Sequence, residues 1–301
     1  MALLYLFESV RSPILDIISQ VFLCFGSDLF FLCVTSVIFW CFSKKAAYKL
    51  VFTYVLFTPV IYMANIIIRS PFPFSSSPGL SSADLAVSNA SGYSLPSIGI
   101  FTITVLCAVI FINNFNVLVK IICIITALLT FLSYIYLGLC SMWSAVISII
   151  LGVGVSLLFS KFRDNYLFDT RQYPVYLGLS FIPTFVFLVV SVSMYLNGVI
   201  TLGAFSCTLR VIGMNAALLF SWFFESNFVN FSIRCERASG QFLKALTGTA
   251  GTLITWFALY FLLNLIPGFW LAPFICNVIT TLGAFSAFPL FIRAVFSSAY
   301  K

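Results

Sequence analysis

The chain has 301 residues, of which 62% are hydrophobic and only 8% are charged. A soluble domain needs far more charge to cover its surface, so the composition excludes a soluble protein and predicts an integral membrane protein. The net charge of +7 is accounted for by the topology of the membrane spans, and no nucleic-acid partner is needed to explain it. Histidine is absent, which removes the commonest general base and the commonest metal ligand, so we predict no cofactor and no metal.

Apolar runs close to the length of a membrane span, about 20 residues, follow a short N-terminal interfacial helix, Met1–Arg11. The ten spans are expected at about Pro13–Phe25, Leu29–Phe42, Ala46–Ile68, Ile98–Ile112, Val117–Leu132, Trp143–Ser160, Tyr176–Leu196, Leu202–Phe224, Phe242–Leu265 and Trp270–Phe296. The predicted fold class is therefore an all-α integral membrane protein. A charged linker, Lys161–Asn165, separates six spans in residues 1–165 from four spans in residues 166–301.

Lysine and arginine residues fall on one side of the membrane when the spans alternate. That side, or its edge, carries Arg11, Lys44, Lys45, Lys49, Lys120, Lys161, Arg163, Arg171, Arg234, Arg237, Lys244, Arg293 and Lys301. The positive-inside rule makes this side cytoplasmic, together with both chain termini. Only Arg69 falls at the opposite face, and Arg210 falls inside a span. The segments Asn65–Ser97 and Ser133–Met142 are then expected to meet on the extracytoplasmic face.

Three short stretches carry a resemblance to a known family: FESVRSP at Phe7–Pro13, GYSLPS at Gly92–Ser97 and YLG at Tyr136–Gly138. In order, spacing and membrane side, they resemble the type 2 phosphatidic acid phosphatase superfamily of membrane lipid phosphate phosphatases. The similarity is to a bacterial branch with extra C-terminal spans. It covers residues 1–160, and the rest of the chain resembles that branch's C-terminal extension more loosely. The resemblance implies a six-helix phosphatase-like bundle in a bacterial inner (cytoplasmic) membrane.

Active enzymes of this superfamily carry the motifs Lys-x6-Arg-Pro, Pro-Ser-Gly-His and Ser-Arg-x5-His-x3-Asp. In the mechanism that the resemblance implies, the histidine of the third motif attacks phosphorus and the aspartate orients that histidine. The histidine of the second motif protonates the leaving alcohol. The lysine and the arginines bind the phosphoryl oxygens, because charged and fork-shaped donors match a phosphate group.

This chain retains scaffold residues of the three motifs but changes every ionisable position. The retained residues are Pro73, Pro96, Ser97 and Ser133. The six replaced residues, called the motif positions below, are Asn65 for lysine, Phe72 for arginine, Gly99 for the proton-donating histidine, Tyr134 for arginine, Cys140 for the nucleophilic histidine and Ser144 for aspartate. Each lost group is typically worth about two to four powers of ten in rate. The leading hypothesis is therefore a catalytically inactive, phosphatase-like membrane protein, or pseudoenzyme.

Two other functions stay open. An unconventional lipid phosphate phosphatase would use Cys140, Ser97 or Arg69. A reactive Cys140 thiolate would need a nearby positive charge, for which Arg69 is the candidate. In a transporter or a subunit of a membrane complex, the four C-terminal spans and Arg210 would matter more than the motif positions.

A pseudoenzyme of this kind would bind a lipid, an isoprenoid amphiphile or a membrane-protein partner in the former cleft, and it would also be able to form a homo-oligomer. The ligand-binding candidates are Arg69, Tyr93, Ser94, Ser97, Tyr134, Ser141, Ser144 and Arg210. The neutral hydroxyls of the serines and tyrosines among them suit an uncharged or sugar-like headgroup better than a phosphate monoester. The alternative is a polar cluster whose members bond only to one another. A charged Arg210 inside a span requires a partner, either a lipid headgroup or helix carbonyls.

Overall fold

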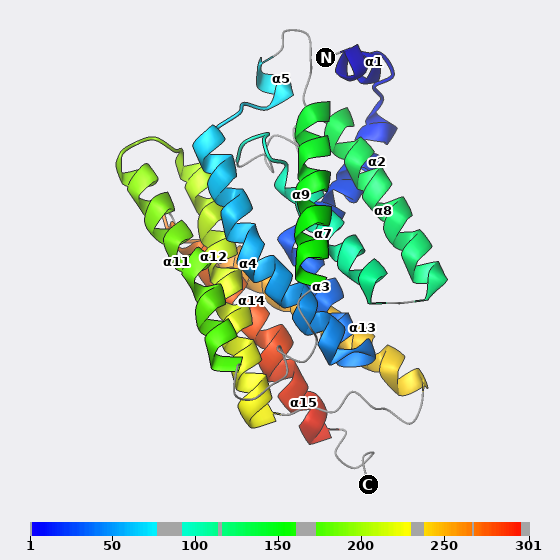
Figure 1. Cartoon of the computed structure of the whole chain (residues 1–301), viewed down its shortest axis with the longest axis vertical. Coiled ribbons are helices and arrows are strands. Elements are labelled where there is room, and N and C mark those ends of the chain that lie inside the picture. The colour runs from blue at the N-terminus through cyan, green and yellow to red at the C-terminus, as the bar shows by residue number, and fades with distance from the viewer. Residues whose placement is uncertain are drawn as a thin grey trace. The chain divides into compact units, whose positions relative to one another are not determined.

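The structure, a computed structural model, describes residues 2–76, 92–113, 116–160, 173–229, 238–266 and 268–295. These residues form helices and connecting loops with no strand among them, and their apolar helices confirm an all-α membrane protein (Figure 1). The middle of the segment Asn65–Ser97 and the linker Lys161–Asn165 lie outside the described residues.

The elements follow one another along the chain as short, medium and long helices. They are α1 (Ala2–Ser9), α2 (Pro13–Leu23), η1 (Cys24–Gly26), α3 (Asp28–Val37), η2 (Ile38–Phe42), α4 (Lys44–Ile68), α5 (Pro73–Ser76), α7 (Ile98–Ile112), α8 (Val117–Tyr136), α9 (Met142–Ser160), α11 (Tyr173–Leu196), α12 (Leu202–Phe224), η3 (Glu225–Val229), α13 (Ala238–Asn264), α14 (Ala272–Leu282), η4 (Gly283–Ala287) and α15 (Phe288–Val295).

Seven helical segments in the described part of the chain are long and apolar enough to cross a membrane. They are Lys44–Ser76, Val117–Tyr136, Met142–Ser160, Leu177–Leu196, Leu202–Val229, Gly240–Asn264 and Ala272–Ile292. The first two predicted spans form instead one bent pair, Pro13–Gly26 and Asp28–Phe42, with an angle of 60° between them. Each half rises only roughly 22 Å, less than the hydrocarbon thickness of about 30 Å. The expectation of two separate spans here is therefore wrong.

Two compact units interleave along the chain, whereas the sequence predicts a single boundary at residue 165. Unit 1 comprises Met1–Phe31, Phe57–Asp164 and Val190–Phe205, and unit 2 comprises Leu32–Leu56, Asn165–Val189 and Ser206–Lys301. Helix α4 contributes its first half to unit 2 and its second half to unit 1. The motif positions all belong to unit 1.

Helix α7 forms the centre of unit 1 and packs against both α8 and α9 (Figure 1). It has only 15 residues, and all but a few of them are buried. The face of α9 that is buried carries small residues at every fourth position, namely Ser144, Ser148, Gly152 and Ser156. Small residues at this spacing let two membrane helices approach closely. A Cβ atom at Gly152 would lie 2.9 Å from the Thr104 side chain of α7.

The N-terminal helix α1 lies at the end of α8 that leads into the segment 133–142 (Figure 1). Leu4 packs with Ile135 and Cys140, and the backbone N–H of Ser12 donates to the Tyr136 hydroxyl at 3.3 Å. The expectation that the N-terminus and this segment lie on opposite sides is therefore wrong. The physical reason is the bend at Ser27, because the bent pair provides at most one crossing where two were expected.

Unit 2 buries a charged cluster around Glu225, which is only 3% exposed. Lys44 and Tyr48 both donate hydrogen bonds to its carboxylate. The fully buried Lys244 donates to the backbone carbonyl of Trp40, 3.4 Å away, close to the end of η2. Both charges are thus compensated, as buried charges must be, the lysine by a carbonyl at a helix C-terminus.

We expect Gly152→Val to destabilise the protein, because its side chain would meet Thr104 and the Phe101 carbonyl. Overpacking of this kind costs about 1–3 kcal/mol, and the midpoint of thermal unfolding in detergent should fall accordingly. The matched control is Gly154→Val on the same helix, where a Cβ atom meets nothing within 4 Å. Equal unfolding midpoints for the two variants would contradict the close α7–α9 contact.

Candidate functional site

The segments that carry the motif positions meet at one end of unit 1, as the sequence predicts. Asn65, near the end of α4, is buried, and its side-chain amide donates to the carbonyls of Tyr93 (2.8 Å) and Pro96 (3.0 Å). Its side-chain oxygen accepts a hydrogen bond from the Tyr93 N–H at 3.3 Å. A lysine has donors but no acceptor and could not make this set of contacts. Asn65 therefore clamps the loop before α7 to α4.

A second set of hydrogen bonds joins the same loop to α9. The hydroxyl of Ser144, one of the motif positions, donates to the carbonyl of Ser94. One turn further along α9, the Ser148 hydroxyl accepts from the Ser97 N–H at 2.7 Å and donates to the Ser144 carbonyl at 2.8 Å. Ser141 precedes α9, and its hydroxyl accepts from the Ser144 N–H at 3.2 Å. These serine hydroxyls are engaged with the protein's own backbone.

The Tyr134 side chain occupies the space next to the Gly99 Cα in which a side chain at position 99 would lie. A Cβ atom at Gly99 would lie 1.8 Å from the Tyr134 hydroxyl oxygen and 2.4 Å from its ring Cζ. The same hydroxyl lies 2.9 Å from where a Cβ atom of Gly26 would stand. Separations below 3 Å are impossible in a close-packed interior, so no side chain fits at position 99 while Tyr134 is in place. Glycine at position 99 and tyrosine at position 134 are thus sterically complementary.

Phe72, another of the motif positions, makes apolar contacts. Its ring stacks on Phe74 with centroids 5.5 Å apart, and both pack on buried Leu137 and Leu139. The backbone N–H of Phe74 donates to the carbonyl of Gly138 at 3.4 Å. Gly138 has φ = +69°, a conformation that glycine adopts without strain. This motif position now joins the loop after α4 to the loop between α8 and α9.

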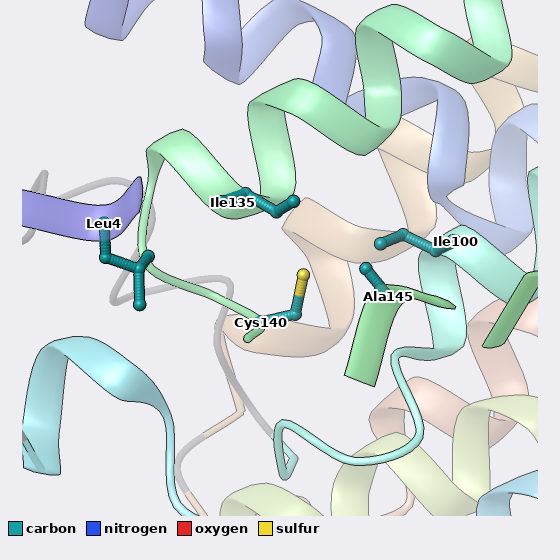
Figure 2. Close-up of a cluster of buried hydrophobic side chains, with 5 residues drawn as sticks. All are labelled: Leu4, Ile100, Ile135, Cys140 and Ala145. Carbon is teal, nitrogen blue, oxygen red and sulfur yellow. The ribbon is translucent and has the colours of Figure 1, made fainter. Parts of the chain in front are cut away.

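Cys140 is fully buried in an apolar cluster with Leu4, Ile100, Ile135 and Ala145. Figure 2 shows its sulfur pointing in among the last three of these side chains. Burial raises the pKa of the Cys140 thiol far above its ordinary value, and a hydrogen bond with Ser97 offsets this only in part. Cys140 is therefore a protonated thiol at neutral pH, and a thiolate nucleophile is not supported.

The two arginine candidates occupy different environments. Arg69 follows α4, is exposed, and has φ = +50°, which is uncommon outside glycine. Its N–H donates to the Asn65 carbonyl at 3.1 Å. Arg210 belongs to unit 2, where its guanidinium donates to the Cys207 sulfur of the same helix at 2.8 Å. The motif positions, in contrast, all belong to unit 1.

The sequence prediction missed three contributors to this cluster. Ser148 holds the Ser97 N–H, the carbonyl of Ser70 accepts from the Ser94 N–H at 2.9 Å, and Gly26 makes room for Tyr134. The four-residue spacing of small residues in α9 was the available signal for Ser148.

No group of three cysteine, aspartate or glutamate side chains gathers in a metal-binding arrangement within the described residues.

Comparisons with family models, with curated proteins and with solved structures found no match. The resemblance to the lipid phosphate phosphatases therefore rests on the order and spacing of the motifs in this chain alone.

We expect Gly99→Ala to cost about 1–3 kcal/mol of stability, because the new methyl group would overlap the Tyr134 ring. In a Tyr134→Ala background the same substitution should hardly change the free energy of unfolding. The coupling energy between the two positions should therefore be at least about 1 kcal/mol. Unfolding of the four proteins of this double-mutant cycle measures the coupling.

The control cycle replaces Gly99→Ala with Gly154→Ala, which lies in open space and should be additive with Tyr134→Ala within about 0.5 kcal/mol. If Gly99→Ala costs the same in both Tyr134 backgrounds, the steric complementarity is refuted.

Proposed function

We propose that the protein is a catalytically inactive member of the type 2 phosphatidic acid phosphatase superfamily, in which the motif positions have become structural contacts. The observation that carries this proposal is the Tyr134 side chain in the space above Gly99. In an active relative this is the position of the histidine that protonates the leaving alcohol. Here the position has no side chain, and its space is filled by a phenol.

The other motif positions support the same conclusion. Phosphoryl transfer needs a nucleophile and several positive charges around the phosphoryl oxygens. Cys140 is a buried neutral thiol, Phe72 packs on apolar side chains, and the Asn65 side chain is bound to backbone groups. Since each missing group is worth about two to four powers of ten, their combined loss removes ordinary turnover.

The hydrogen bonds also narrow the ligand-binding hypothesis. The side chains of Ser94, Ser97 and Ser144 are buried, and the network described above uses their hydroxyl or backbone groups to hold the loop on α9. This arrangement favours the self-bonded polar cluster over a headgroup pocket at these serines. Arg69 is exposed and Tyr93 is half-buried, so a headgroup or a membrane partner that approaches this end of unit 1 would meet these two first.

The test is release of inorganic phosphate from phosphatidic acid and from undecaprenyl diphosphate by the purified protein in lipid nanodiscs. We expect the rate to equal that of empty nanodiscs, and Cys140→Ala to leave it unchanged. A known phosphatase added to the same nanodiscs would show that the substrates are accessible. Turnover by the wild-type protein that Cys140→Ala abolishes would contradict the pseudoenzyme assignment.

A further inference from the structure

Unit 1 contains an apolar groove between α7, α8 and α9 with a volume of about 540 Å³. Its walls include Ile100 and Phe111 of α7, Ile124 and Leu128 of α8, and Val153 and Leu157 of α9. From Ile100 to Phe111 the groove follows α7 for roughly 17 Å at the helical rise of 1.5 Å per residue. This volume is in the range of sites that hold an organic ligand.

The groove offers hydrocarbon and almost no hydrogen-bonding capacity. The Thr104 hydroxyl donates to the Ile100 carbonyl at 2.6 Å, and the Cys107 thiol donates to the Cys123 carbonyl at 3.2 Å. These polar groups of the lining are therefore already satisfied by the protein. A ligand segment with its own polar atoms would lose its hydrogen bonds to water there, so the chemistry of the walls selects a hydrocarbon chain.

The groove opens on the outer surface of the membrane-spanning helices. Ile124, Leu128 and Leu157 are each more than half exposed, at 53%, 56% and 51%. Because these residues belong to helices that are long and apolar enough to cross a membrane, the medium at this opening is lipid. A hydrocarbon chain can therefore enter sideways without crossing water.

A cation stands at one end of the groove. The Lys120 ammonium lies 5.7 Å from the centroid of the Phe111 ring, which is part of the groove wall. Among the described residues, no carboxylate lies within ion-pair distance of Lys120. Lys120 also sits in the first turn of α8, which begins at Val117, where the helix dipole adds partial positive charge. Both features favour an anionic group at this end.

We propose that the groove holds one hydrocarbon chain of an anionic phospholipid whose phosphate lies against Lys120. The chain runs along α7 from Phe111 towards Ile100. The phosphate lies near the start of α8, roughly 20 Å along that helix from Tyr134, and thus at the end remote from the motif positions. The site does not rest on the proposed pseudoenzyme function, because it uses none of the motif positions.

The test is native mass spectrometry of the protein released from nanodiscs that contain equal amounts of phosphatidylglycerol and phosphatidylcholine with identical chains. We expect one retained lipid per protein, with phosphatidylglycerol preferred about fivefold, the effect of one lysine at a lipid phosphate. Lys120→Gln should bring the preference close to one. Lys45→Gln, at an exposed lysine of unit 2, should leave it unchanged.

A second pair of variants tests the groove itself. Ala127→Trp would place an indole in the groove, since Ala127 is part of its lining, and should reduce retention of both lipids at least fivefold. Ile125→Trp on the same helix, exposed and outside the lining, should retain lipid as the wild type does. If Ala127→Trp fails to fold, the Lys120→Gln comparison decides alone.

Three results would overturn the proposal. One is unchanged lipid retention in folded Ala127→Trp, and another is an unchanged preference for phosphatidylglycerol in Lys120→Gln. The third is a protein dimer that carries no lipid and that Ala127→Trp dissociates, because a second copy of the chain would then be the occupant of the groove.

Discussion

The close packing of α7 on α9 is the constraint on which the rest of unit 1 depends. It is possible because the buried face of α9 carries a row of small residues at four-residue intervals, from Ser144 to Ser156. This contact brings the start of α7 against Ser148 and so fixes Gly99 beside Tyr134. A groove remains beside this helix pair, and α8 forms its third wall.

The contacts made by the motif positions depend on one another. Tyr134 fits only because position 99 lacks a side chain. Asn65 both donates to and accepts from the backbone of Tyr93, which a lysine side chain could not do. A substitution at one of these positions would thus disturb contacts made by the others. Hydrogen bonds to backbone groups and apolar contacts thus hold the segments that carry the motif positions together.

The sequence allowed the all-α membrane fold, most of the helices and the meeting of the three motif segments to be predicted, because apolar run length and motif order determine them. The side of the N-terminus was mispredicted, because the bent pair Pro13–Gly26 and Asp28–Phe42 was counted as two crossings. The packing of the Tyr134 side chain against Gly99 could also not be predicted from the sequence. It depends on the relative positions of η1, α7 and α8 rather than on residue identity.

The proposed loss of catalysis depends on the packing of the Tyr134 phenol against Gly99. A cryo-electron microscopy map of the protein in a lipid nanodisc, at a resolution that defines side chains, tests it most directly. The account predicts density for the Tyr134 ring directly against the Gly99 Cα, with no solvent-filled space between them. A Tyr134 ring turned away from Gly99, with an open polar cleft in its place, would contradict the account.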